Sequence, residues 1–161
     1  MQIHLEAIGI VRASRTAARD DHWGASESSI ELTGLFEASA LAGLEEFSHV
    51  EVLFLFHGVD PEDVTRGRRH PRNNPAWPEV GIFAQRAKNR PNRIGSTICP
   101  IQKIEGRSLW VKELDAIDGT PVLDLKPVLA EFLPRSVLRQ PAWSKELMRD
   151  YWAPESSRPD R

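Results

Sequence analysis

Short runs of apolar residues, alternating with polar ones or rich in β-branched and aromatic side chains, dominate the chain and predict strands. The clearest run is 49–57, HVEVLFLFH. Further strands are expected at 3–12, 29–35, 79–85, 96–104, 108–114 and 121–126. Strands and helices do not alternate regularly. The predicted fold is therefore mainly β, a small antiparallel β-barrel with short helices and a C-terminal helix.

The remaining segments predict two helices and two loops. A short helix is expected at 38–46, and a C-terminal helix at 144–152, where Ser144 precedes apolar residues at helical spacing. The segments 13–28 and 58–78 are expected to be loops, and the second is rich in proline and long enough to be functional. We expect one domain over 1–152 and a frayed tail over 153–161.

Length and composition exclude several classes of protein. A chain of 161 residues fits one domain, and its one cysteine excludes both a disulfide framework and a cysteine-based zinc site. The glycine fingerprint for dinucleotides, the P-loop, the nucleophile elbow and the H-E-x-x-H zinc motif are all missing from the sequence. No signal pattern or membrane-length apolar run is present. The expectation is a cytoplasmic protein with no membrane partner and no metal.

Charge is distributed very unevenly along the chain. The segment 66–93 holds eight basic residues and one acidic residue, Glu79, for a net charge of +7, which leaves −9 elsewhere in a chain whose net charge is −2. Such asymmetry favours a surface that binds a polyanion, nucleic acid above all. The alternative is a solvated basic loop balanced by acidic neighbours.

Two motifs carry the chemistry. The stretch 81–95, GIFAQRAKNRPNRIG, gathers basic residues around a Pro-Asn pair, and 114–127, LDAIDGTPVLDLKP, sets Asp115, Asp118 and Asp124 around a Gly-Thr-Pro turn. Arginine forks suit carboxylate or phosphate groups, whereas carboxylates suit an ammonium group or a ribose diol. The two motifs together indicate a ligand with both anionic and cationic parts.

These motifs, together with EFSHVEVLFLFH at 46–57, resemble the signature of the TsaA-like (YaeB-like, TrmO) family in the same order along the chain. The resemblance covers about residues 8–127. It implies a β-barrel methyltransferase that uses S-adenosyl-L-methionine, forms a homodimer and acts on tRNA. The implied reaction methylates N6 of N6-threonylcarbamoyladenosine at tRNA position 37.

The resemblance also implies site residues. The family's N-terminal loop often carries a Pro-Arg-Gln element that supports the cofactor, and here the corresponding stretch reads RTAARDDHWG. We therefore expect residues of this loop to remake that contact. The expected cofactor-binding residues are Asp21, Trp23, His57, Gly58, Arg86, Arg90, Asn92, Ser96, Ala116, Ile117, Asp118 and Gly119.

The acceptor nitrogen needs a base, for which Asp118, Asp124 and His57 are equal candidates. The expected tRNA platform consists of Arg66, Arg68, Arg69, Arg72, Lys88 and Arg93. Local alternatives remain: Arg86 and Arg90 as structural ion-pair partners of the aspartates, and Trp23 as a core residue. Three other functions also stay open, namely methyl transfer to another acceptor, a non-catalytic RNA-binding barrel and a ligand sensor that binds the nucleoside without chemistry.

Overall fold

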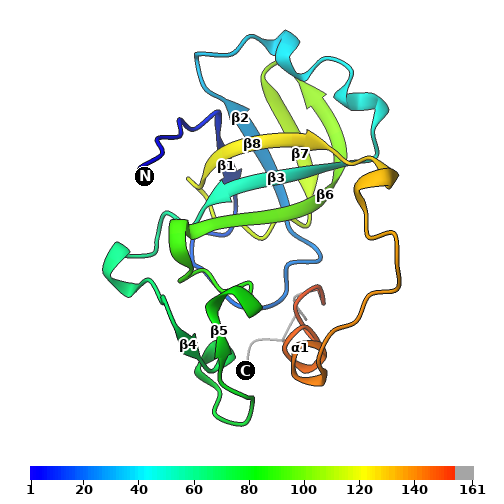
Figure 1. Cartoon of the computed structure of the whole chain (residues 1–161). Coiled ribbons are helices and arrows are strands. Elements are labelled where there is room, and N and C mark those ends of the chain that lie inside the picture. Colours follow the sequence, from blue (N-terminus) through cyan, green and yellow to red (C-terminus); the bar gives the residue numbers. More distant parts are fainter. Residues whose placement is uncertain (155–161) are drawn as a thin grey trace, which may run out of the picture.

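The fold is a closed antiparallel barrel of six strands, as the sequence predicts. The computed structural model describes residues 1–154, so most of the predicted tail, 155–161, lies outside the described residues. Around the barrel the strand order is β1, β2, β7, β6, β3, β8, and β8 pairs back to β1 (Figure 1). The strands are β1 (Gly9–Ala13), β2 (Glu27–Leu32), β3 (His49–Leu55), β6 (Ile94–Glu105), β7 (Ser108–Lys112) and β8 (Pro121–Pro127).

Alternation along the strands fills the barrel interior. On β3, Val50, Val52 and Phe54 are buried, whereas the residues between them are only partly buried. Gly95 on β6 pairs with Phe54, and a Cβ at this position would lie 2.5 Å from the Phe54 ring. Only glycine therefore allows the phenyl ring to occupy the barrel at this level. The other large apolar side chains of the interior include Val11, Ile30, Leu109, Val111 and Val122.

Three segments expected to be functional leave the barrel from the same end. Because neighbouring strands are antiparallel, β1, β3 and β7 end where β2, β6 and β8 begin. The loop 14–26, the long excursion 56–93 and the turn 113–120 therefore all start at this end, which we call the site end. The short strands β4 (Arg68–Arg69) and β5 (Val80–Gly81) and the helix α1 (Ala142–Leu147) lie below it in Figure 1.

The N-terminal strand is shorter than its sequence pattern predicts. Residues 3–8 alternate, but β1 begins only at Gly9, and Ile3 and Leu5 are 74% and 64% exposed. On one side β2 ends at Leu32, opposite Gly9, and on the other side the pairing with β8 ends at Val122, so Ile8 is the first residue with backbone hydrogen bonds to both neighbours. An alternating segment without a pairing partner does not form a strand.

Two other predicted elements are wrong. The segment 38–46 forms two 3-10 turns, Ala38–Leu41 and Leu44–Glu46, because Gly43 between them adopts a left-handed conformation with φ of +87°. The predicted strand at 79–85 keeps only the two residues of β5, since β4, its partner, is equally short. Residues Ile82–Ala84 form another 3-10 turn.

The C-terminal helix is also shifted. It covers Ala142–Leu147 with Pro141 at the N-cap, and the Ser144 hydroxyl donates a hydrogen bond to the Pro141 carbonyl at 2.8 Å. Ser144 is thus inside the helix and not its cap. Tyr151 lies beyond the helix end, in a segment that reaches the site end.

Candidate active site at one end of the barrel

Asp115 is the centre of the polar contacts at the site end. It lies just after β7 in the turn 113–120, and its two carboxylate oxygens accept hydrogen bonds from the Thr97 hydroxyl on β6 and the Tyr151 hydroxyl. Burial, and then the neighbouring Asp115 carboxylate, raise the pKa of the Tyr151 hydroxyl well above its usual range. Tyr151 therefore remains protonated and acts as a donor to Asp115 throughout the physiological pH range.

The rest of this turn is fastened to β1. The Asp118 carboxylate accepts a hydrogen bond from the Ala13 amide at 3.1 Å, and the Asp118 amide donates to the Arg15 carbonyl at 2.8 Å. Gly119 has a φ of +78° and donates to the Val11 carbonyl, and Ile117 accepts from the Thr120 amide. These contacts fix the predicted cofactor segment, residues 116–119, at the mouth of the barrel.

A pocket of about 360 Å³ opens beside this turn. The loop segments 13–19 and 22–28 supply most of its lining, and Ala116 closes it from the turn. Trp23 is 3% exposed, and the Arg15 guanidinium lies 3.9 Å from the centre of its ring. The sequence-based alternative of Trp23 as a core residue thus agrees with its burial, while one side of the residue still lines the pocket.

Two buried polar atoms in the pocket lining lack hydrogen-bond partners among the described residues. They are the Ser28 hydroxyl, on β2, and Nδ1 of His22, in the loop. A buried polar group without a partner costs free energy comparable to a lost hydrogen bond. A ligand group that reaches either atom would satisfy it.

Arg86 and Ser96 form a second group of polar contacts near Asp115. The Arg86 guanidinium donates to the Ser96 carbonyl, and the Ser96 hydroxyl donates to the Glu51 carboxylate at 2.6 Å. Ser96 precedes Thr97, whose hydroxyl donates to Asp115. Asp115 therefore connects the Arg86–Ser96 group to the turn 113–120, which lies beside the pocket. Arg86 contacts a backbone carbonyl and pairs with neither predicted aspartate.

The three candidate bases have different surroundings. Asp118 is fastened to β1, and Asp124 on β8 faces solvent in an ion pair with Lys126 at 2.8 Å, which raises the pKa of that lysine. His57 follows β3, is exposed with Gly58, and its imidazole has no polar partner among the described residues. Of the three candidates, only the His57 side chain makes no polar contact with a described residue.

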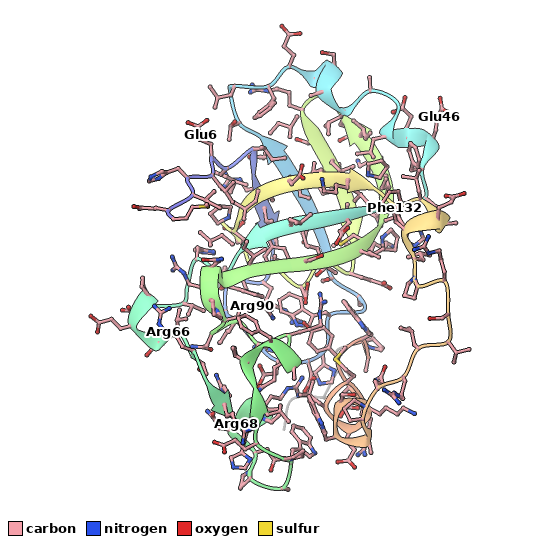
Figure 2. The ribbon with its side chains drawn as sticks, in the orientation of Figure 1. Glu6, Glu46, Arg66, Arg68, Arg90 and Phe132 are labelled. Carbon is pink, nitrogen blue, oxygen red and sulfur yellow. The ribbon has the colours of Figure 1, made fainter. Side chains whose placement is uncertain are left out.

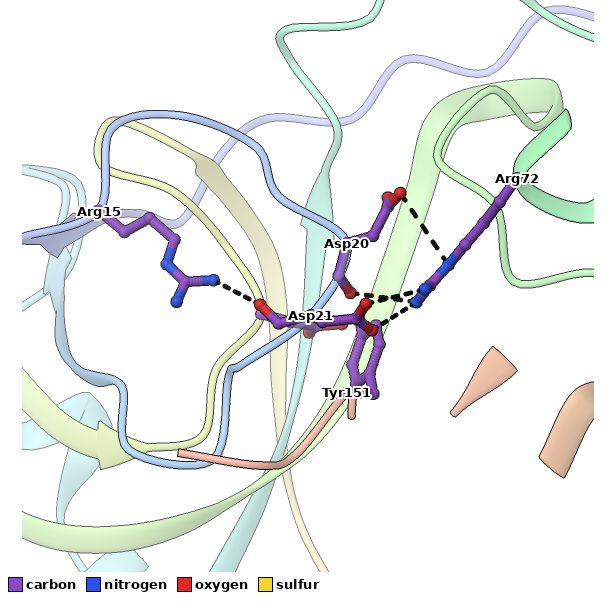
Figure 3. A network of polar contacts seen from close by, with 6 residues as sticks. Arg15, Asp20, Asp21, Arg72 and Tyr151 are labelled. Atoms are coloured by element: carbon purple, nitrogen blue, oxygen red, sulfur yellow. Dashed lines mark hydrogen bonds and ion pairs between the residues drawn. The ribbon is translucent and has the colours of Figure 1, made fainter. Parts of the chain in front are cut away.

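Several predicted tRNA-binding arginines are occupied by contacts within the chain. Arg72 makes a bidentate pair with Asp21 at 2.7 and 3.0 Å, beside Tyr151 (Figure 3). Arg69 donates to Asn73, and Arg93 donates to the Val59 carbonyl. The contacts of these three arginines hold the excursion 56–93 in its conformation.

Exposed cations remain on the same excursion. The side chains of Arg66, Arg68 and Lys88 are exposed and make no polar contact with another described residue, and the first two residues lie on the excursion in Figure 2. Asn92 is exposed with φ of +63°, inside the turn Pro91–Arg93, and Arg90 donates to the Gln85 carbonyl at 2.8 Å. The Arg-Pro-Asn motif therefore forms a tight turn with its arginine directed inward.

Some residues of the site escape sequence reasoning. Tyr151 follows a predicted helical spacing, and nothing in that pattern indicates a contact with a residue 36 positions away. Ser28 and Thr97 are small polar residues on strands without a motif of their own. Asp115 is the exception, since it belongs to the LDAIDG stretch and was open to prediction.

Within residues 1–154, no helix is long and apolar enough to cross a membrane, and no cluster of three or more His, Cys, Asp or Glu side chains has the arrangement of a metal site.

Comparisons with known proteins agree with this architecture. The chain superimposes on the crystal structure of TrmO from Pseudomonas aeruginosa with a TM-score of 0.71 and 32% identity, covering 86% of this chain and 61% of that one. The fold is thus the β-barrel of the TrmO structures. The model of the tRNA-methyltransferase O N-terminal domain matches residues 12–132, and the chain belongs to this family. The resemblance predicted from the sequence motifs is confirmed.

The relatives with a described function differ in how much of their own length this chain matches. A tRNA (adenine(37)-N6)-methyltransferase from Mus musculus is 44% identical over 93 residues, which are 58% of this chain and 21% of that protein. A "Probable S-adenosyl-L-methionine-binding protein" from Methanothermobacter thermautotrophicus is 35% identical over 135 residues, covering 79% of this chain and 90% of the relative. The chain thus spans about a fifth of the mammalian relative and most of the archaeal one.

Proposed function

We propose that this protein is an S-adenosyl-L-methionine-dependent methyltransferase that acts on N6 of adenosine at tRNA position 37, with N6-threonylcarbamoyladenosine as its substrate. The observation that carries the proposal is the family match, because residues 12–132 include the pocket, the turn 113–120 and the Arg-Pro-Asn turn. The description of the mouse relative supports adenine 37 of tRNA as the acceptor base, and that of the archaeal relative supports the methyl donor; the threonylcarbamoyl group follows from the resemblance of the sequence motifs.

The residues at the site end fit this methyl donor. A pocket of about 360 Å³ lies within the range of small-molecule sites, about 300–1,000 Å³. Trp23 and Ala116 supply apolar walls, while Ser28 and His22 supply polar atoms that lack protein partners. When bound, S-adenosyl-L-methionine supplies an electrophilic methyl group.

The proposed site extends from this pocket across Asp115 to Arg86 and Ser96. The cationic Arg86 suits the carboxylate end of an amino-acid group, and Asp115 suits a hydroxyl or ammonium donor. Because the protein positions reactants and does no covalent chemistry of its own in such a transfer, rigid placement supplies most of the acceleration. The backbone contacts of the turn 116–119 provide that rigidity.

We assign His57 as the base. Methylation of the acceptor nitrogen requires a group that takes up its proton, and that group must have a free lone pair. Asp118 and Asp124 keep free lone pairs, but the first is held by a backbone amide and the second by Lys126, whereas the His57 imidazole has no polar partner within residues 1–154. Its position at the end of β3 places it next to the basic excursion.

The exposed cations Arg66, Arg68 and Lys88 form the proposed tRNA surface. We further propose a cytoplasmic homodimer. Its support is the segment 129–138, where Phe132, Val137 and Leu138 are 87%, 97% and 73% exposed, an unusual exposure for large apolar side chains. Light scattering on the purified protein measures the oligomeric state.

The proposal is tested by incubating the protein with S-adenosyl-L-methionine and tRNA, followed by mass spectrometry of the nucleosides. The expected product is a methylated threonylcarbamoyladenosine, formed on tRNA that carries the threonylcarbamoyl group and not on tRNA that lacks it. Methylation of both tRNAs would make adenosine itself the acceptor.

A second function has its own support, because the archaeal relative is described only as binding S-adenosyl-L-methionine. Methyl-donor binding without transfer to either tRNA would favour another acceptor. Salt-sensitive tRNA binding without methyl-donor binding would favour a non-catalytic RNA-binding barrel.

A further inference from the structure

The C-terminal segment reaches the site end from outside the part of the chain that the family model matches. That match ends at residue 132, whereas Asp150–Trp152 lie against the loop 20–24. The His22 amide donates to the Asp150 carbonyl at 3.1 Å, and the Trp23 amide donates to the Tyr151 carbonyl at 2.8 Å. Both acceptors lie on the segment, so backbone hydrogen bonds fix its register.

Local sequence supports this docking at two further positions. A Cβ on Gly24 would lie 1.8 Å from the Trp152 carbonyl oxygen, so only glycine admits the segment this closely. The Trp77 indole donates to Glu146 at 2.9 Å, which connects α1 to the basic excursion. Trp77 therefore anchors its loop to the helix. The segment is therefore held from the loop and from the excursion at once.

This docking delivers the Tyr151 hydroxyl to Asp115. Tyr151 is partly buried, and burial and the Asp115 carboxylate raise the pKa of its hydroxyl, an effect that the positive charges of Arg86 and Arg72 partly oppose. Figure 3 shows Tyr151 beside the Asp21–Arg72 pair. With Thr97 on one oxygen and Tyr151 on the other, the Asp115 carboxylate is fixed in orientation. Each oxygen keeps a further lone pair for a ligand donor.

We propose that Tyr151 is a positioning residue of the active site, which orients the Asp115 carboxylate toward a hydroxyl or ammonium donor of the bound methyl donor. The C-terminal segment 142–152 is then part of the site. This inference rests on the proposed function, since it assigns Asp115 a contact with S-adenosyl-L-methionine.

Calorimetric titration of the full-length protein with S-adenosyl-L-methionine tests the role. Tyr151→Phe removes only the hydroxyl, and we expect it to weaken binding about fivefold to tenfold while the protein stays folded with a modestly lower melting temperature, because Asp115 loses one donor. Ser144→Ala is the matched control, because it removes a hydroxyl of the same segment that contacts only Pro141 and Gln140. This control should bind like the wild type.

A double-mutant cycle separates positioning from a general structural effect. If Tyr151 acts through Asp115, Tyr151→Phe should have little further effect on binding in an Asp115→Ala background. Equal and additive losses in both backgrounds would overturn the proposal. The melting temperature of each variant identifies any loss caused by unfolding.

The remaining outcomes are distinct. Wild-type affinity in Tyr151→Phe would overturn the positioning role and leave the proposed function intact. Tighter binding would also overturn it, because the hydroxyl would then compete with the ligand for Asp115. Absence of binding by the wild type would refute the proposed function and this inference with it.

Discussion

Single side chains at the site end fall into two groups, those satisfied within the chain and those that are not. Arg72 and Asp21 satisfy one another in a bidentate pair, and both are about three-quarters buried. Ser28 and His22 have buried polar atoms with no partner among the described residues. The first group holds the scaffold, and the second is available to a ligand.

Arg72→Met tests the scaffold role at this scale. It leaves the Asp21 carboxylate partly buried without its partner, so we expect the free energy of unfolding to fall by about 1–3 kcal/mol. Arg12→Met is the matched control, because its pair with Glu31 is half-exposed on both sides, is screened by solvent and should contribute much less to stability. Urea unfolding measures both. Equal decreases in the free energy of unfolding would show that the Arg72–Asp21 pair contributes no more to stability than the exposed pair.

At the scale of elements, the strands were predictable and the turns were not. The runs at 49–57, 96–104, 108–114 and 121–126 correspond to β3, β6, β7 and β8, because each is paired on both sides over part of its length and its alternation fills the core. The predicted strand over residues 3–8 and the predicted helix at 38–46 do not form. The former lacks a strand partner, and the latter is interrupted at Gly43.

Packing between β3 and β6 yields a prediction about Gly95. Gly95→Ala places a methyl group against the Phe54 ring, and overpacking of this kind costs about 1–3 kcal/mol of stability. Gly34→Ala is the control, since no atom lies within 4 Å of its added Cβ. Thermal melts followed by circular dichroism should show a clear decrease for the first variant only. A Gly95→Ala protein as stable as the wild type would contradict the packing described for Phe54.

At the scale of the whole molecule, the motifs predicted which segments meet but not how they are joined. The Asp turn and the Arg-Pro-Asn stretch both lie at the site end, as their shared chemistry suggests. Tyr151 joins Asp115 through a hydrogen bond between residues 36 positions apart, a relation that no local pattern contains. The same limit explains why the count of basic residues did not separate Arg72, which is paired, from Arg66, which is exposed.

The exposed cations predict the salt dependence of tRNA binding. Replacing Arg66 and Arg68 by Gln should weaken tRNA binding and make the slope of log K against log salt concentration shallower by about 1–2. The reason is that a protein with fewer phosphate contacts releases fewer counterions when it binds. The control replaces Lys103 and Arg107, near the opposite end of the barrel. Filter binding over a range of salt concentrations measures both slopes. Equal changes would indicate binding by overall charge and no defined surface.

The central claim is that the pocket beside the turn 113–120 holds the methyl donor, and calorimetric titration of Ser28→Ala with S-adenosyl-L-methionine tests it most directly. Removing a buried hydroxyl that has no protein partner should leave the protein as stable as before or more so, while weakening binding about threefold to tenfold. Thr33→Val is the control, because it removes another unpartnered buried hydroxyl outside the pocket and should leave binding unchanged. Wild-type affinity in Ser28→Ala would contradict the assignment of this pocket.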